Sequence, residues 1–115
     1  FGHASGDEAL RQVGRALART FLRRVDFVCR FGGDEFGVIL QETGSQGAAA
    51  LAEKLRQAIA DVRASASDSE SPLEFTLSIG IAELRLGDDV VSWTQRADAA
   101  LYAAKDAGRD QVVAS

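Results

Sequence analysis

Residues 26–40, DFVCRFGGDEFGVIL, contain two short apolar runs separated by glycines and acids. The runs Asp26 to Phe31 and Phe36 to Leu40 are rich in aromatic and β-branched residues, which favour strands. The tract between them, Gly32 to Glu35, has the composition of a tight turn. The stretch therefore predicts a β-hairpin.

One amphipathic helix is predicted before this hairpin and another after it. The first begins at about Gly6, and the second ends before a polar loop, Ser65 to Ser71. Both predictions rest on apolar residues at helical spacing, which buries one face of a helix. These residues are Leu10, Val13, Leu17 and Phe21 in the first helix and Ala48, Leu51, Leu55, Ile59 and Val62 in the second.

The remainder of the chain predicts a strand, a helix and a last strand. From Phe75 to Glu83 large apolar residues alternate with small ones, as in a strand with one bulky face. Ser92 and Gln95 resemble a capping-box pair at the start of a helix that Gly108 ends, and Gln111 to Ala114 follows as a strand. The element order predicts an α/β (α+β) sandwich, in which helices flank one mostly antiparallel sheet.

Length and composition indicate one folded domain covering residues 1–115. The chain has 46% hydrophobic and 26% charged residues, a globular balance. No apolar run approaches the roughly 20 residues that span a bilayer, so we expect a soluble cytoplasmic domain without membrane contact. The single cysteine, Cys29, lies in an apolar run and is assigned no chemical role.

The charge pattern argues against nucleic acid as a partner. The formal net charge is −4, whereas nucleic-acid binding requires clustered cations. Four arginines nevertheless recur every fourth residue and predict a basic stripe on the first helix. A solvated helix face is the favoured interpretation, and a nucleic-acid surface is the weaker alternative. The stripe comprises Arg11, Arg15, Arg19 and Arg23.

The tip of the predicted hairpin is a candidate site. Gly32 and Gly33 let the backbone turn and let a phosphate approach its N–H groups. Asp34 and Glu35 supply hard oxygen ligands, which suit Mg²⁺ bound together with substrate phosphates. The alternative is an ordinary tight turn with an exposed acidic tip, and the tract alone does not separate the two.

Four segments of the chain carry a further pattern: Phe1 to Asp7, Arg30 to Phe36, Thr76 to Ala82 and Ala97 to Asp110. In this order they resemble the GGDEF family of diguanylate cyclases, which condense two GTP into cyclic di-GMP. The resemblance implies a nucleotide-cyclase or palm-like fold, and it places the family's first strand before Phe1.

The resemblance assigns the hairpin residues to catalysis and metal binding. It implies that Asp34 binds Mg²⁺, with Mn²⁺ as a possible substitute, and activates the attacking 3′-hydroxyl. Glu35 supports the metal site, and Gly32 and Gly33 contact the nucleotide.

Further residues are implied in binding GTP. Asp7 would accept the two donors of guanine, and His3 would belong to the same pocket. Lys105 and Arg109 would bind phosphates from one helix face. The alternatives are a helix-dipole role for Asp7, a surface position for His3 and simple C-terminal capping by the two cations. The family usually has asparagine where this chain has Asp110.

A product-binding site is implied just before the hairpin. Arg23 and Asp26, three residues apart, resemble the family's inhibitory site for cyclic di-GMP. Arginine can bind guanine or phosphate acceptors while aspartate accepts guanine donors. A charge pair at the helix end is the alternative, and the product site is favoured.

Three functions remain open, in descending order of weight. The first is an active cyclase that works as a homodimer and follows an upstream sensory or receiver domain. The second is a non-catalytic cyclic di-GMP receptor, and the third is a nucleic-acid contact through the arginine stripe. Because the family's first strand supplies an aspartate, a lysine and an asparagine, we expect this chain to be a fragment. Alone it would bind nucleotide but turn over GTP slowly or not at all.

Overall fold

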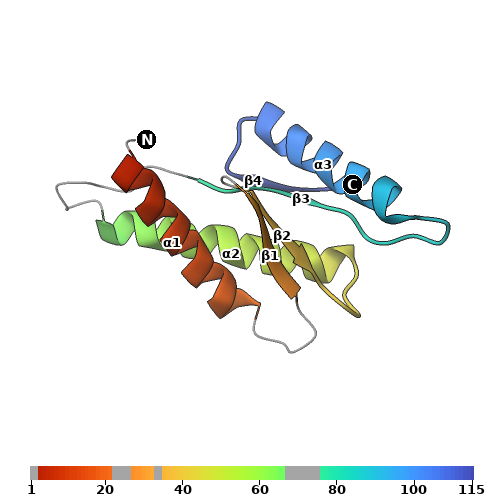
Figure 1. Ribbon diagram of the computed structural model, residues 1–115, viewed down its shortest axis with the longest axis horizontal. Coiled ribbons are helices and arrows are strands. Elements are labelled where there is room, and N and C mark those ends of the chain that lie inside the picture. Colours follow the sequence, from red (N-terminus) through yellow and green to blue (C-terminus); the bar gives the residue numbers. More distant parts are fainter. Residues whose placement is uncertain (1–2, 22–26, 33–34, 67–75) are drawn as a thin grey trace. The chain divides into compact units, whose positions relative to one another are not determined.

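The computed structural model describes the backbone of residues 3–21, 27–32, 35–66 and 76–115, and the side chains of residues 8–21, 27, 36–64 and 76–115 (Figure 1). The elements follow the predicted order. Among the described residues, no helix is both long enough and apolar enough to cross a bilayer. The elements are α1 (His3–Thr20), β1 (Phe27–Gly32), β2 (Glu35–Ile39), α2 (Ser45–Ala66), β3 (Ser78–Ile81), α3 (Val90–Asp106) and β4 (Gln111–Ala114).

The strands form one antiparallel and one parallel pair. β1 pairs with β2 in the antiparallel sense, as predicted for a hairpin, whereas β3 and β4 are parallel. The predicted single, mostly antiparallel sheet is therefore not confirmed among the described strands. The reason is the connection: α3 lies between β3 and β4 and returns the chain so that both strands run in the same direction.

The chain divides into two compact units. One contains residues 1–42 and 57–75, and the other contains residues 43–56 and 76–115. The boundary falls within α2, whose residues 45–56 belong to the second unit and whose later residues belong to the first. Each unit is described by itself below.

The first unit contains α1 and the β1–β2 hairpin. Val13 and Leu17 of α1 are buried as predicted, together with Ala9 and Ala16. These positions share one face because they are separated by three or four residues. The helix begins at His3 rather than near Gly6.

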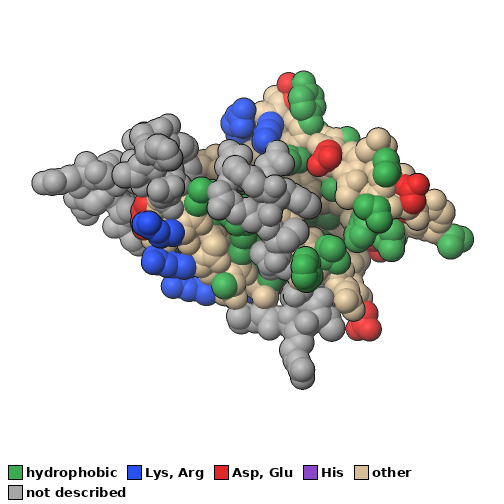
Figure 2. All heavy atoms as spheres, viewed as in Figure 1, with side chains coloured by type: hydrophobic (Ala, Val, Ile, Leu, Met, Phe, Trp, Pro, Cys, Tyr) green, Lys and Arg blue, Asp and Glu red, His purple; other side chains and the backbone are tan. Residues whose placement is uncertain are grey.

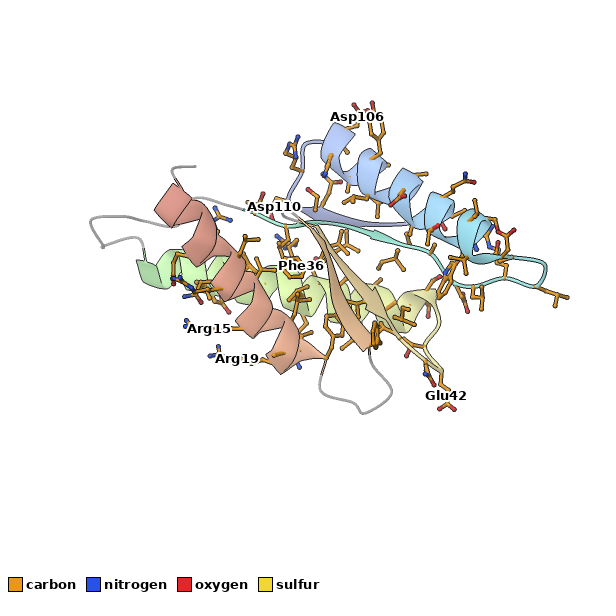
Figure 3. The ribbon with its side chains drawn as sticks, in the orientation of Figure 1. Arg15, Arg19, Phe36, Glu42, Asp106 and Asp110 are labelled. Atoms are coloured by element: carbon orange, nitrogen blue, oxygen red, sulfur yellow. The ribbon has the colours of Figure 1, made fainter. Side chains whose placement is uncertain are left out.

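The opposite face of α1 carries the arginine stripe. Arg11, Arg15 and Arg19 are exposed, and Figure 2 shows cationic side chains in a row over this helix. Figure 3 labels Arg15 and Arg19 on the same face. Arg11 pairs with Glu8 at 3.2 Å, an exposed i, i+3 pair that contributes little to stability. Arg23, the fourth member of the stripe, lies outside the described residues.

The second unit packs α3 against β3 and β4 (Figure 1). Gly80 of β3 makes this packing possible, because a Cβ atom there would lie 2.7 Å from Leu101 Cα and even closer to two other backbone atoms of α3. The helix contributes buried Ala100 and Ala104 to the contact. The small face predicted for this strand is thus the face that receives a helix. The strand itself is shorter than the predicted Phe75 to Glu83.

Trp93 of α3 adds a hydrogen bond at one end of the contact between α3 and β3. The Trp93 indole N–H donates to the Ala82 carbonyl at 2.9 Å, which satisfies a carbonyl beyond the end of β3. At the same end of the strand, the Ser115 backbone N–H donates to Ile81 O at 2.8 Å. Both bonds extend the contact between α3, β3 and β4 past the limits of the strands.

The start of α3 is a capping box, but with different residues from those predicted. Asp89 is the N-cap and accepts from the Ser92 N–H at 2.7 Å, while the Ser92 hydroxyl accepts from the Asp89 N–H at 3.1 Å. The prediction that Ser92 itself caps the helix with Gln95 is wrong. The N-cap lies three residues earlier than predicted, because the side chain of Asp89 already satisfies an N–H group of the first turn.

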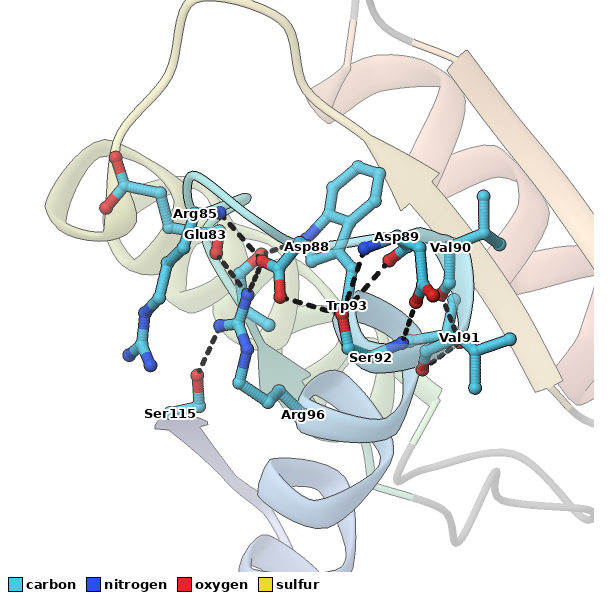
Figure 4. Close-up of polar contacts among 12 residues, drawn as sticks. Glu83, Arg85, Asp88, Asp89, Val90, Val91, Ser92, Trp93, Arg96 and Ser115 are labelled. Carbon is cyan, nitrogen blue, oxygen red and sulfur yellow. Dashed lines mark hydrogen bonds and ion pairs between the residues drawn. The ribbon is translucent and has the colours of Figure 1, made fainter.

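An ion pair braces the loop before α3 (Figure 4). Asp88 accepts from the Arg85 N–H at 2.7 Å and from the Ser92 hydroxyl at 2.9 Å, and it pairs with Arg96. Arg96 also donates to Glu83 O at 2.9 Å. These bonds tie the turn that follows β3 to the first turns of α3. The Arg85 N–H, then the Ser92 hydroxyl and Arg96, lower the pKa of Asp88.

Candidate functional site

The glycine-acid tract, Gly32 to Glu35, lies at the end of the hairpin that connects β1 to β2. The register pairs Phe27 with Ile39 and runs to Gly32 opposite Glu35, so only residues 33–34 connect the paired ends. The pairing is irregular between Arg30 and Gly32, as in a β-bulge. Bulges redirect the backbone and are frequent next to active sites. The predicted pair of antiparallel strands on either side of the tract is therefore confirmed, but Gly32 and Glu35 are the paired ends of β1 and β2 rather than turn residues.

The structure describes only part of the predicted catalytic pair. Gly33 and Asp34 lie outside the described residues, and Glu35 is described by its backbone alone, as the first residue of β2. The described residues include no group of three potential metal-ligating side chains. The assignment of a metal site to Asp34 and Glu35 stays a prediction.

The predicted guanine residues lie on α1. His3 is the first residue of the helix, and Asp7 follows in the second turn. The alternative role of Asp7 as a first-turn acid loses support, because the first turn contains no acid. The side chains of both residues lie outside the described set, as do Arg23 and Asp26 of the predicted product site.

The predicted phosphate ligands lie at the C-terminal end of α3. Lys105 occupies the last turn, but Arg109 lies beyond the helix, which ends at Asp106. The prediction that one helix face carries both cations is therefore wrong in its geometry. Arg109 is placed instead by the turn that follows the helix. Both side chains are exposed, and neither makes an ion pair with any residue that the structure describes.

This turn is a Schellman motif with unusual residues. The Arg109 N–H donates to Ala104 O at 2.9 Å and the Gly108 N–H to Lys105 O at 3.4 Å, which closes the helix as predicted for a glycine cap. Gly108 has a φ of +116°, but Arg109 and Asp110 also have positive φ, +64° and +48°. Positive φ is uncommon in non-glycine residues and concentrates at functional sites.

Arg56 of α2 forms an ion pair with the last residue of this turn, Asp110. Its Nη1 atom donates to Asp110 Oδ1 at 3.0 Å, and its Nε atom donates to Glu53 Oε2 at 3.0 Å. Glu53, then Asp110, raise the pKa of Arg56. Sequence reasoning missed Arg56, because its partner lies 54 positions away. The one available signal was Asp110, an acid at a position where the family usually has an amide.

A comparison with protein families identifies the domain. Residues 1–111 match the family model described as "Diguanylate cyclase, GGDEF domain". The chain belongs to the GGDEF family of diguanylate cyclases. This confirms the resemblance inferred from the hairpin tract and the three other segments.

Individual GGDEF relatives align with nearly the whole chain. This chain is 38% identical over 114 residues to the response regulator PleD of Caulobacter vibrioides. It is 41% identical over 112 residues to the diguanylate cyclase DgcP of Pseudomonas aeruginosa. These alignments cover 98% and 97% of this chain, but the chain spans only 25% of PleD and 16% of DgcP.

A solved GGDEF structure supports the fold. The GGDEF domain of DgcB from Caulobacter crescentus, solved in complex with c-di-GMP, aligns with a TM-score of 0.84 at 34% identity. The alignment covers 99% of this chain and 67% of that one. The mixed helix and strand content predicted from the sequence is therefore that of the GGDEF fold.

Proposed function

We propose that this domain condenses two GTP molecules into cyclic di-GMP and releases pyrophosphate. The observation that carries the proposal is the position of the tract Gly32 to Phe36, at the end of an irregular antiparallel hairpin in a chain that matches the diguanylate cyclase family. Glycine in such a tract would allow a phosphate to approach backbone N–H groups. An ordinary acidic turn would explain the hairpin but not the family match.

Asp34 and Glu35 are the proposed catalytic pair. Asp34 would accept the proton of the attacking 3′-hydroxyl, and both carboxylates would hold a divalent cation, Mg²⁺ or Mn²⁺. When bound, the cation would neutralise charge on the phosphate oxygens. The chemistry of this donor set fits such a cation, because aspartate and glutamate supply hard oxygen ligands.

The remaining proposed residues position the nucleotide. Asp7 would accept from guanine, with His3 in the same pocket, and Lys105 and Arg109 would bind the triphosphate. The exposure of Lys105 and Arg109 supports this role, since both cations are open to solvent. Gly32 and Gly33 would allow the nucleotide close to the backbone.

Each domain would present one GTP to the other across a two-fold homodimer. Each 3′-hydroxyl attacks the α-phosphorus of the partner's nucleotide in line, which forms a P–O bond and expels pyrophosphate. Product would inhibit the enzyme by binding at Arg23 and Asp26. An upstream sensory or receiver domain would regulate dimer formation. A cytoplasmic location, where GTP is available, stays a prediction, as does slow turnover by the 115-residue chain alone.

The test is cyclisation of GTP by the protein that carries this domain. With GTP and Mg²⁺ we expect cyclic di-GMP by chromatography, and Asp34→Asn should lower the rate at least 100-fold, within the range of a lost acid–base group. Asp61→Asn is the matched control, because Asp61 is an exposed carboxylate whose side chain bonds only to Gln57 among the described residues. Absence of product from the unmodified protein would eliminate the cyclase proposal.

A second candidate function is a cyclic di-GMP receptor. The similar DgcB domain was solved in complex with c-di-GMP, which favours ligand binding by this domain as well. Calorimetry should then detect cyclic di-GMP binding that Arg23→Ala weakens at least tenfold. Binding without cyclisation would favour the receptor, and no binding by the unmodified protein would exclude it.

A further inference from the structure

The turn after α3 holds three consecutive residues in a conformation that only the first adopts readily. Gly108, Arg109 and Asp110 have φ values of +116°, +64° and +48°. Glycine tolerates positive φ and aspartate does so moderately, but arginine rarely adopts it. Such a backbone persists only where surrounding contacts hold it.

Three sets of contacts hold this turn. The Arg109 N–H donates to Ala104 O, which fixes the turn to the last turns of α3. The side-chain Nε2 of Gln111 donates to Ala107 O at 3.2 Å and to Arg109 O at 3.0 Å. These two sets come from within the turn and its flanks.

The third contact comes from outside the turn. Arg56, on residues 45–56 of α2, binds Asp110 at 3.0 Å within the same compact unit. Figure 3 labels Asp110 after the end of α3. The Arg56 side chain is only 22% exposed, and Glu53 orients it through bonds from Nε and Nη2. A guanidinium held on one side by a carboxylate loses less freedom when it binds a second one.

We propose that Arg56 is a positioning residue for GTP binding: its ion pair with Asp110 keeps the turn in the conformation that presents Arg109 to the triphosphate. The proposal rests on the proposed cyclase function, in which Arg109 binds phosphate. Arg56 does not contact the nucleotide and acts only through the turn. The carboxylate of Asp110 gives the pair full charge, whereas asparagine at this position would offer only its amide oxygen.

Steady-state kinetics tests the role of Arg56. Arg56→Met retains the aliphatic stem of the side chain and removes its charge. It should raise KM for GTP about fivefold and leave kcat nearly unchanged, because losing one surface ion pair should weaken the binding of ground state and transition state equally. Asp110→Ala should have the same effect. Asp110→Asn should rescue most of it, because asparagine accepts a hydrogen bond and tolerates positive φ.

A double-variant comparison separates positioning from general stability. If Arg56 acts only through Arg109, then Arg56→Met should raise KM less than twofold in an Arg109→Ala background. A full fivefold effect in that background would overturn the proposal. The control is Arg85→Met, which removes an exposed arginine side chain of the same unit and should leave KM unchanged.

Amide hydrogen exchange provides a readout that requires no GTP turnover. Arg56→Met should speed exchange of the Arg109 N–H about fivefold, and Arg85→Met should not. If no variant or unmodified protein cyclises GTP but exchange still responds, the proposed function fails and the positioning role of Arg56 stands. If exchange at Arg109 is unchanged by Arg56→Met, the positioning role is overturned whatever the activity.

Discussion

Gly80 is the position at which a single methyl group would disturb the packing of the second unit. Its Cα lies against the backbone of α3 near Ala97 and Leu101, which cannot yield as a flexible side chain would. The strand and the helix therefore meet backbone to backbone over this residue. Such close approach is a general use of glycine where two elements must pack tightly.

Gly80→Ala is accordingly expected to lower the free energy of unfolding by about 1–3 kcal/mol, the usual cost of overpacking. Urea denaturation followed by circular dichroism measures this. Gly14→Ala is the matched control, because a Cβ there meets nothing within 4 Å and Gly14 lies inside α1. That control should instead stabilise the protein by about 0.5–1 kcal/mol. Equal effects of the two substitutions would contradict the packing argument.

At the scale of single residues, sequence reasoning could find groups whose neighbours lie close in the chain. Lys105, Arg109 and the tract Gly32 to Glu35 were proposed as site residues because their spacing resembles a family pattern, and their roles stay predictions. Arg56 was missed because periodicity assigns a residue to a helix face but cannot identify a partner 54 positions away. The position of Arg109 was also wrong in detail, since the helix ends three residues before it.

Among the elements, the start of α3 concentrates the polar contacts of the second unit. Asp88 and Asp89 satisfy the N–H groups of Arg85 and Ser92, and Asp88 also binds Arg96. Only 10% of the Asp88 side chain is exposed. Loss of its charge would therefore leave several donors without their best acceptor.

Asp88 should make stability depend on pH in the acid range. Its pKa in the folded protein is lower than the ordinary value of 3.8, so its contribution is present above that value and is lost as the pH falls through the folded pKa. The urea midpoint should fall between about pH 5 and pH 2, and Asp88→Asn should lower the midpoint at neutral pH and flatten this dependence.

Asp98→Asn is the control for this pH dependence. Asp98 is an exposed carboxylate on α3, the helix that follows Asp88, so its substitution should leave the acid-range fall intact. An identical pH profile for Asp88→Asn and the unmodified protein would show that the network before α3 does not depend on the charge of Asp88.

Element order followed from periodicity, while element ends and strand direction did not. The hairpin and β4 were predicted within a residue or two, because a glycine-containing turn adjoins each of them, at Gly32–Gly33 and at Gly108. The N-cap was placed on Ser92, since a serine and a glutamine three apart fit a capping box, but Asp89 offers the earlier acceptor. Alternation along β3 predicts a face and not a pairing direction, so the parallel pair with β4 was not foreseen.

For the whole molecule, the proposed reaction requires two domains. One active site presents one GTP, so the rate of cyclisation per subunit should rise with protein concentration until the dimer predominates. Product formation measured over a dilution series, with sedimentation for the mass, tests this. A specific activity that stays constant in samples that sediment as monomers would contradict the two-domain mechanism.

The mixed helix and strand content of a GGDEF fold was accessible from the sequence because local patterns and family resemblance agreed, and the comparisons confirm it. The mostly antiparallel sheet is not confirmed. The prediction of one domain over residues 1–115 stays a prediction, beside the observation of two compact units. The division could not be read from periodicity, because α2 is continuous in sequence pattern and belongs to both units.

The bond between Trp93 and Ala82 has a spectroscopic consequence. The chain contains one tryptophan and one tyrosine, Trp93 and Tyr102, and both lie on α3 in the second unit. Indole fluorescence and the absorption of tryptophan and tyrosine therefore originate in that unit, so melting of α1 and the hairpin should change these signals less than it changes the far-ultraviolet signal. A far-ultraviolet transition that precedes the change in emission would reveal the first unit unfolding separately.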